Sequence, residues 1–521
     1  MSADPLDPPT LIADPPQAGG DEATERVPAL TIVWHSDTTR IGETAALPEK
    51  RTEVSRLQPL FQSIRTAGAK AAGLADRHLS ARAPALGIAS RADGVDLSSL
   101  SDTHVTVEGV ELKGTIALSR ADLERGALVV LAHRIVLCVH VVRSHSASPP
   151  RDHGLVGSSD AVDEIRREID RVADLEVPVL LRGETGTGKG MIAQAIVAAS
   201  RRAGRTVLSL NMGATVASTA AADLFGHERG AFTSATATNQ GLFAAADKGT
   251  LFLDEVGLAS PEVQKMLLLA VERGEVLPIG GTRARKIDVR LIAATDTDLE
   301  AAIAAGSFSR ALFERLARYQ ITAPALRHRR EDIGALLLHF LRRAFKAHGL
   351  PDRLDGPGGP AEPWLSAAQV AALAAYAWPG NIRELENVAG QIVVFSRDRE
   401  RAGLPPTVRT RLAAPSADNS ASTRPSPRAR PRRAPNPSPE QVAQALAQSG
   451  TVKAAADSLK VSRTKYYELR LGNPLVGAIN AITDAEIAEC RTEFGGDVVK
   501  MAEALRVSPK ALKDRLARRK Q

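Results

Sequence analysis

A glycine-rich turn between a strand and a helix constrains this chain more than any other feature. The turn reads GETGTGKG at residues 183–190, follows the apolar run VPVLLR and precedes a helical segment that begins near Met191. Backbone N–H groups of such a turn close around phosphates, the helix N-terminus adds partial positive charge, and Lys189 reaches the β and γ oxygens. The alternative, a glycine turn beside a solvated lysine, is disfavoured by the strand and helix on either side. The predicted phosphate-binding residues are Gly183, Glu184, Thr185, Gly186, Thr187, Gly188, Lys189 and Gly190.

A second strand supplies the acidic groups that such a site needs. The apolar run at 250–253 ends in Asp254 and Glu255. An acid at the carboxyl end of a strand holds Mg2+, and its neighbour polarises the attacking water. Gly190 stands where a serine or threonine hydroxyl normally touches the metal, so Mg2+ must depend on other ligands such as Asp254. Together the two motifs predict the hydrolysis of ATP with Mg2+.

The segment around these motifs has the rhythm of an α/β fold. Between residues 154 and 401, the runs VPVLLRG, TVLSLN, GTLFLDE and DVRLIAAT are each followed by a helical segment, as in a parallel sheet. Purely helical segments are expected over 336–350 and 367–396. We therefore predict an α/β P-loop domain over 154–401, with a helical lid from about residue 325.

The N-terminal third has a different composition. The acidic, proline-rich residues 1–28 predict a disordered tail, and residues 29–143 contain the short β-branched runs of an all-β sandwich. Within them, residues 65–89 carry no clear pattern. A Ser/Pro-rich linker follows at 144–153.

Length, charge and cysteine content limit the class of protein. At about 150 residues per domain, 521 residues suggest three or four domains. A net charge of +7 does not by itself indicate a charged partner, unless the basic residues are clustered. Cys138 and Cys490 lie far apart in the sequence, which fits a reducing cytoplasm. The most apolar segment, 126–142, contains His133 and Arg134 and is too short to span a membrane.

The C-terminal part contains a basic linker and an internal repeat. Residues 402–438 are rich in Pro, Ser and Arg, which predicts flexibility. Within 439–521, the segment from residue 449 aligns without gaps on the segment from residue 495. Each copy has the spacing of an all-α helix-turn-helix, which predicts double-stranded DNA as a partner. The candidate DNA contacts are Arg463, Thr464, Lys465 and Tyr467 in the first copy and Lys510 and Lys513 in the second.

Residues 183–401 resemble the AAA+ domain of sigma-54-dependent transcriptional activators, the bacterial enhancer-binding proteins. The most specific match is LFGHERGAFTSA at 224–235, which is similar to the GAFTGA loop of that family. The resemblance implies a homo-oligomeric ring, a hexamer in the family, whose loops contact sigma-54 RNA polymerase when ATP is bound. Ser234 replaces the family's second glycine, which bears on loop flexibility. The loop residues are Gly230, Ala231, Phe232, Thr233, Ser234 and Ala235.

The same resemblance assigns roles to single residues. Asn211 matches the asparagine that holds the hydrolytic glutamate, here Glu255, in an inactive orientation. Asp296 falls at sensor I, where an asparagine is frequent. Arg383, in WPGNIRELENV, matches the sensor II arginine expected to contact the γ-phosphate.

The arginine fingers of the family correspond to FSRALFERL in this chain. Arg315 aligns with the second finger, and Ser309 occupies the place of the first. Arg310 follows one residue later, a rotation of about 100° on a helix. It is therefore either a substitute finger or an ordinary solvated arginine. In the family, these fingers act on the nucleotide of the neighbouring subunit.

Both ends of the chain resemble known modules. The first C-terminal copy resembles the Fis-type DNA-binding unit, and residues 29–143 resemble a forkhead-associated (FHA) domain. Arg40 and Ser80 match phosphothreonine-binding positions of that domain, whereas Ala81 and Thr103 replace an arginine and an asparagine. The region is therefore either a phosphopeptide reader that receives a signalling protein or a sandwich that serves only as a protein-interaction module.

The combined prediction is a cytoplasmic, multidomain transcription activator. It consists of an all-β FHA-like sandwich, an α/β AAA+ P-loop domain with a helical lid, and an all-α helix-turn-helix region. It couples ATP hydrolysis to remodelling of the sigma-54 polymerase closed complex from upstream DNA. The alternative is a DNA-binding regulator whose AAA+ core binds nucleotide but hardly turns over. Ser309, Ser234 and Gly190 favour this alternative. The residues that oppose it are Lys189, Asp254, Glu255 and Arg315.

Overall fold

The computed structural model describes residues 26–47, 50–63, 70–143, 150–215, 217–231, 237–354, 363–413, 459, 484–505, 512 and 516. These residues belong to two compact units that divide between Asn419 and Ser420. Among these residues, no helix has both the length and the apolar character needed to cross a bilayer.

The first unit begins with two antiparallel sheets packed face to face. Their strand orders are β2-β1-β10-β9-β6-β7 and β3-β4-β5-β8. The inner faces share one core of mostly aliphatic side chains, as the sequence predicts for this all-β region. The elements are β1 (Arg26–Trp34), β2 (Thr44–Ala46), β3 (Arg51–Val54), β4 (Leu86–Arg91), β5 (Gly94–Ser99), β6 (Val105–Val107), β7 (Val110–Glu111), β8 (Thr115–Ser119), α1 (Arg120–Arg125), β9 (Ala127–Leu131) and β10 (Ile135–Arg143), with a 3-10 turn η1 (Thr38–Arg40).

A five-stranded parallel sheet follows, in the order β12-β13-β16-β11-β17. The four apolar runs predicted as strands correspond to β11, β12, β13 and β16. The α/β prediction for this part is confirmed. The elements are α2 (Asp160–Val172), β11 (Val179–Arg182), α3 (Lys189–Ala199), β12 (Val207–Asn211), α4 (Ala217–Phe225), α5 (Gly241–Ala245), β13 (Thr250–Asp254), η2 (Val256–Leu258), α6 (Pro261–Arg273), β14 (Glu275–Val276), β15 (Arg285–Lys286), β16 (Arg290–Thr295), α7 (Leu299–Ala304), α8 (Arg310–Leu316) and β17 (Tyr319–Thr322).

Helices complete the unit as a lid. The segment 367–396, predicted as helical, contains two helices. The first ends at Ala375, where Tyr376 is extended, and Trp378, which precedes a proline and has a φ of 50°, keeps the connection non-helical before a new helix begins at Asn381. The elements are η3 (Leu326–His328), η4 (Arg330–Asp332), α9 (Ile333–Ala347), α10 (Ala367–Ala375), α11 (Asn381–Phe395) and α12 (Pro406–Ala413).

Serine caps begin several of these helices. The Ser159 side chain accepts from the backbone N–H of Val162 at the start of α2. Ser366 and Gln369 form a reciprocal capping box at the start of α10. Each cap satisfies backbone donors that a helix leaves without a partner.

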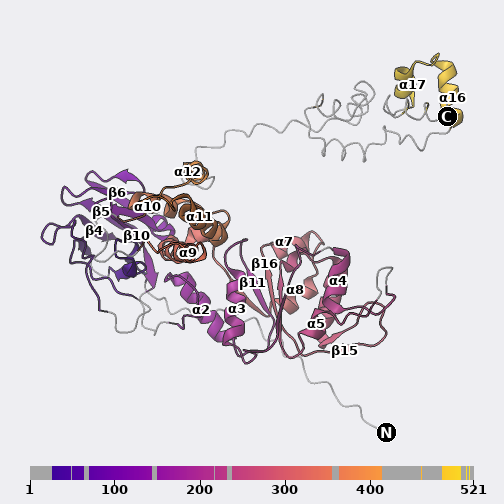
Figure 1. Ribbon diagram of the computed structural model, residues 1–521, viewed down its shortest axis with the longest axis horizontal. Helices are drawn as coiled ribbons and strands as arrows, with labels where there is room; N and C mark the ends of the chain where they lie inside the picture. Colours follow the sequence, from indigo (N-terminus) through magenta and orange to yellow (C-terminus); the bar gives the residue numbers. More distant parts are fainter. Residues whose placement is uncertain are drawn as a thin grey trace, which may run out of the picture. The chain divides into compact units, whose positions relative to one another are not determined.

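The sandwich and the lid share one apolar core. Trp34, Leu128 and Cys138 of the sandwich lie in the same buried cluster as the apolar faces of α9, α10 and α11. Figure 1 shows α10 beside β10. Strands β9 and β10 read as continuous apolar runs, the pattern of strands that are buried on both faces. The sequence predicts the two regions as separate modules. In the structure, the outer face of one sheet is covered by the lid.

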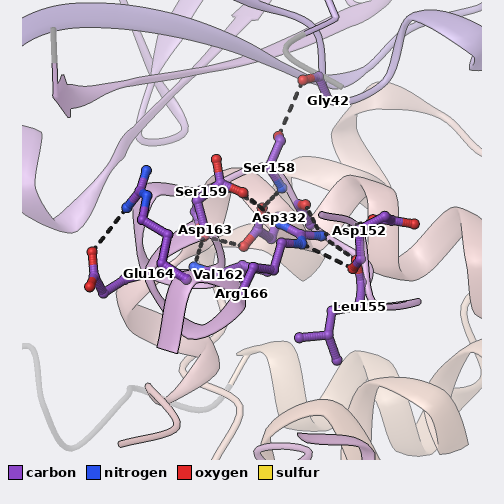
Figure 2. Close-up of polar contacts among 12 residues, drawn as sticks. Gly42, Asp152, Leu155, Ser158, Ser159, Val162, Asp163, Glu164, Arg166 and Asp332 are labelled. Carbon is purple, nitrogen blue, oxygen red and sulfur yellow. Dashed lines mark hydrogen bonds and ion pairs between the residues drawn. The ribbon is translucent and has the colours of Figure 1, made fainter. Parts of the chain in front are cut away.

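A buried aspartate joins three segments at this junction (Figure 2). Asp332 is 0% exposed and accepts from the backbone N–H groups of Ser158 and Ser159 at 2.7 and 2.9 Å and from the Ser159 hydroxyl at 2.5 Å. The Ser158 hydroxyl donates to the carbonyl of Gly42 in the sandwich at 3.2 Å. The carboxylate of Asp332 therefore joins the start of the lid to the approach to α2, and Ser158 joins that approach to the sandwich.

The second unit contains α16 (Asp484–Glu493) and α17 (Val498–Ala504). Ile487 and Cys490 of α16 pack against Met501 and Ala502 of α17. The repeat places Met501 and Ala502 where two helices cross closely, and both are 0% exposed. The first copy lies outside the described residues, apart from Leu459.

Candidate nucleotide site

A cavity of about 80 Å³ opens beside the glycine turn. Four parts of the fold form it: the turn between β11 and α3, the carboxyl end of β13, the carboxyl end of β16, and the first turn of α11. The parallel strands β11, β13 and β16 end at the same edge of the sheet, which is where ligands of open α/β sheets bind. The lining residues are Thr185, Gly186, Gly188, Lys189, Gly190, Asp254, Glu255, Asp296 and Arg383.

The lysine of the glycine turn lies over the turn itself. The Lys189 ammonium donates to the carbonyl oxygens of Gly183 and Glu184 at 2.7 and 3.1 Å. Burial lowers the pKa of Lys189, while the nearby carboxylates of Asp296 and Asp254 oppose that shift. The ammonium thus lies between the loop carbonyls and the carboxylates that line the cavity. In that position it can form ion pairs with the oxygens of a bound phosphate.

Asn211 contacts a different carboxylate from the one predicted. Its amide nitrogen donates to Asp254 Oδ2 at 3.1 Å, whereas the sequence analysis paired it with Glu255. The reason is strand register, since β12 and β13 place Asn211 directly beside Asp254. Glu255 has a φ of 56°, and its carboxylate lies against Gly213, where an added Cβ would come within 1.9 Å of Oε2. In this conformation Asn211 therefore contacts Asp254, and its pairing with Glu255 remains a prediction.

The cavity fits Mg2+ only as an ion held together with a nucleotide. Asp254 supplies a carboxylate, the ligand type that Mg2+ prefers, but among the described residues no three acidic, histidine or cysteine side chains form a cluster that could hold a metal ion. Gly190 supplies no side-chain oxygen, and a Cβ built on it would meet nothing within 4 Å. The cavity thus has room for a ligand at this position but no oxygen there.

Two further residues of the turn make contacts that the motif does not predict. Thr185 donates its hydroxyl to the Asp296 carboxylate, which ties the turn to β16. Glu184, predicted among the phosphate-binding residues, directs its carboxylate to Arg327 and Asn381. No sequence motif indicates Arg327 or Asn381 as partners of Glu184, although Asn381 lies within the segment WPGNIRELENV.

The candidate arginine fingers lie on α8 and do not line the cavity described above. Arg315 is exposed and donates from Nε to Glu272 Oε1 at 2.8 Å. Ser309 caps α8, since its hydroxyl accepts from the N–H of Leu312 at 3.4 Å. Arg310 is exposed as the first residue of that helix.

Of the residues predicted to contact sigma-54 or DNA, the structure describes only Gly230 and Ala231. Gly230 is exposed with a φ of 84°, and Ala231 is partly buried. Backbone bonds between His227 and Asn239, 2.9 Å in both directions, close the base of this loop. Outside the described residues lie Phe232, Thr233, Ser234, Ala235, Arg463, Thr464, Lys465, Tyr467, Lys510 and Lys513.

The two phosphopeptide candidates differ in their surroundings. Arg40 is buried, and its guanidinium donates to Glu43 Oε2 at 2.9 and 2.7 Å and to the carbonyls of Ala72 and Gly73. Ser80 is exposed, and its hydroxyl accepts from the N–H groups of Arg82 and Ala83 at 3.1 and 2.9 Å. The guanidinium of Arg40 is thus engaged within the chain in this conformation.

The central region matches two known protein families. Residues 155–322 match the Sigma-54 interaction domain, and residues 327–421 match the AAA+ ATPase lid domain. The central region is thus similar to a sigma-54 interaction domain followed by an AAA+ lid. Both are domains of AAA+ P-loop NTPases, so the match supports the predicted P-loop fold and its helical lid.

Proteins that are similar to the central region are named as transcriptional regulators. The transcriptional regulatory protein ZraR of Klebsiella oxytoca is 42% identical over 248 residues, which cover 48% of this chain and 54% of ZraR. The anaerobic nitric oxide reductase transcription regulator NorR of Aeromonas salmonicida is 36% identical over 310 residues, 58% of this chain and 59% of NorR. The chain thus matches about half the length of these curated relatives. A solved structure of NtrX from Brucella abortus in complex with ATP aligns at 27% identity and a TM-score of 0.43, over 70% of this chain and 69% of NtrX.

Proposed function

We propose that this protein is a sigma-54-dependent transcriptional activator whose central domain hydrolyses ATP. The observation that carries the proposal is the single cavity that joins Lys189, Asp254, Glu255 and Arg383. These are the groups that phosphoryl transfer to water needs: a cation at the phosphates, a metal-holding acid, a carboxylate for the water and an arginine at the γ-phosphate.

Each group has a distinct role in the proposed reaction. The backbone of the glycine turn and Lys189 bind the β- and γ-phosphates, and Arg383 approaches the γ-phosphate from the lid. Glu255 orients the water and accepts its proton. Asp254 holds Mg2+, which when bound neutralises charge on the phosphate oxygens. Asn211 fixes the carboxylate of Asp254 through its 3.1 Å hydrogen bond.

The wider activity extends the same proposal to the other parts of the chain. Subunits form a homo-oligomeric ring in which Arg315, and Arg310 as a candidate, reach a neighbour's nucleotide. The loop at 230–235 contacts sigma-54 RNA polymerase, and the C-terminal region binds upstream double-stranded DNA in the cytoplasm. The sandwich relays a signal to the ring. Arg315 must leave Glu272 to act between subunits, and both side chains are exposed enough to separate.

A second candidate function is nucleotide binding with little turnover. This function is favoured by the residue at the place of the first arginine finger. That residue is Ser309, which caps a helix and carries no charge. In this reading, the ATP-bound and nucleotide-free forms assemble differently without rapid hydrolysis.

Phosphate release measured across protein concentration separates the two functions. The matched variants are Glu255→Gln and Glu262→Gln, since Glu262 is an exposed glutamate on the neighbouring α6 and does not line the cavity. We expect the rate per subunit to rise with concentration in wild type and in Glu262→Gln, and to be lost in Glu255→Gln. A wild-type rate equal to that of Glu255→Gln at every concentration leaves only nucleotide binding.

Transcription from a sigma-54 promoter in a purified system tests the coupling to polymerase. We expect Thr233→Ala to hydrolyse ATP but to lose transcription. Equal transcription from both proteins removes the loop from the proposed mechanism.

A further inference from the structure

The carboxylate of Glu184 is an unusual group in a phosphate-binding turn, because a free negative charge there would repel a polyphosphate. Its two oxygens accept from the guanidinium of Arg327 at 2.6 and 2.8 Å, a bidentate pair. Oε2 also accepts from the amide nitrogen of Asn381 at 3.0 Å. These bonds lower the pKa of Glu184 to about 2, so the carboxylate stays ionised. They also hold it on the lid, and Glu184 is not among the residues that line the cavity.

Asn381 links this carboxylate to the lid and to the backbone of the turn. It is the first residue of α11, is 0% exposed and has a φ of 51°, in the left-handed region. Its amide nitrogen donates to the carbonyl of Thr185 at 3.1 Å, and its Oδ1 accepts from the N–H of Leu326 at 2.8 Å. A non-glycine residue keeps such a conformation only where its surroundings fix it.

The next two residues of α11 bind the turn through their backbone. The N–H groups of Ile382 and Arg383 donate to the carbonyl of Gly186 at 2.9 and 3.3 Å. This approach requires glycine, because a Cβ on Gly186 would lie 2.3 Å from the carbonyl of Gly380. The first turn of α11 therefore rests directly on the glycine turn, and the Arg383 side chain lines the cavity.

We propose that Glu184 is a positioning residue that latches α11 to the glycine turn, through Arg327 and Asn381, and so holds Arg383 at the nucleotide. The side chain of Glu184 is held by Arg327 and Asn381, so its carboxylate is not the group that binds phosphate. It acts through the lid, since loss of the latch lets the start of α11 move away from Gly186. A displacement of about 1 Å at a catalytic group is enough to lower a rate by as much as 100-fold. The kinetic part of this inference rests on the proposed ATP hydrolysis, whereas the structural part does not.

Hydrogen exchange of the full chain tests the latch without any activity. The variants are Glu184→Gln and Arg327→Gln, which break the same pair from opposite sides. Glu300→Gln is the matched control, because Glu300 forms a bidentate pair with Arg182 at 2.5 and 2.6 Å, directly before the turn but without contact to the lid. We expect the amides of Ile382 and Arg383 to exchange about tenfold faster in both latch variants and unchanged in the control. Unchanged exchange in the latch variants, or equal acceleration in all three, overturns the latch.

Kinetics then distinguish positioning from a general loss of stability. We expect Glu184→Gln to lower kcat about tenfold in the wild-type background, and by less than about twofold when Arg383→Ala is already present. An equal fold-loss in both backgrounds overturns the positioning role. Absence of ATP hydrolysis in wild type contradicts the proposed function instead, and the exchange result still decides whether the latch exists.

Discussion

The indole Nε1 of Trp34 donates a hydrogen bond to the carbonyl oxygen of Leu365 at 3.2 Å, and this bond joins the sandwich to the lid. Trp34 ends β1, Leu365 lies shortly before α10, and both belong to the shared apolar cluster. The cluster continues along α11, the helix that carries Arg383. The sandwich therefore contributes to the packing of the same helix that completes the nucleotide site.

Truncation of this tryptophan tests the shared core. We expect Trp34→Ala to lower the free energy of unfolding by about 3–5 kcal/mol, because it leaves a large cavity between two elements. Denaturant unfolding followed by circular dichroism measures the change. Trp34→Phe is the milder variant, with an expected loss of about 1–2 kcal/mol. A loss below 1 kcal/mol in Trp34→Ala would contradict a core common to the sandwich and the lid.

Two helix glycines in the lid make a matched pair of tests. A Cβ on Gly334 of α9 would lie 1.7 Å from the carbonyl of Val33, whereas a Cβ on Gly390 of α11 would meet nothing within 4 Å. In an open helix, Gly→Ala stabilises by up to about 1 kcal/mol. We therefore expect Gly390→Ala to raise the melting temperature and Gly334→Ala to lower it by forcing β1 away from α9. Equal stabilisation by both changes would show that β1 does not approach α9 this closely.

The sequence predicted the parts of this molecule that follow from local pattern. The glycine turn, the strand that ends in Asp254 and the sensor arginine each lie in a recognisable run of residues, and the structure brings them to one cavity. The partner of Asn211 could not be predicted, because it depends on the register between β12 and β13. The latch on Glu184 depends on residues that come 143 and 197 positions later. One signal was present but not used, since the continuous apolar run of β9 already indicated that both of its faces are covered.

The buried carboxylate of Asp332 is predicted to be a major determinant of stability. Asp332→Ala removes the acceptor for the N–H groups of Ser158 and Ser159 and leaves buried donors without a partner. We expect a loss of about 3 kcal/mol in the free energy of unfolding. Asp398→Ala is the control, because Asp398 forms an exposed ion pair with Arg397 and such pairs contribute about 1 kcal/mol or less. Similar losses in the two variants would contradict the assigned role of Asp332.

The latch also predicts a pH dependence with a definite sign. The pKa of Glu184 is lowered from its ordinary value to about 2, mainly by the hydrogen bond from Arg327. A lowered pKa means that the folded protein favours the ionised form, so its contribution is complete above the ordinary glutamate pKa and declines as the pH falls toward 2. Glu184 and Arg327 are partly exposed, so we expect no more than about 1 kcal/mol. The difference in melting temperature between wild type and Glu184→Gln should be constant from pH 8 to 5 and shrink below about pH 4.5; a difference that grows in acid would have the wrong sign.

Restoring a hydroxyl at position 190 is expected to strengthen nucleotide binding only when Mg2+ is present. Gly190 is the second residue of α3, and the space beside it is open. A serine there adds one oxygen near the carboxylates of the cavity without displacing any neighbour, and oxygen is the ligand type that Mg2+ prefers. We expect Gly190→Ser to bind a nonhydrolysable ATP analogue about three- to tenfold more tightly in Mg2+ and with unchanged affinity in EDTA. Gly190→Ala controls for helix propensity, because it removes the glycine without adding an oxygen. If alanine and serine give the same gain, the added hydroxyl does not act through the metal.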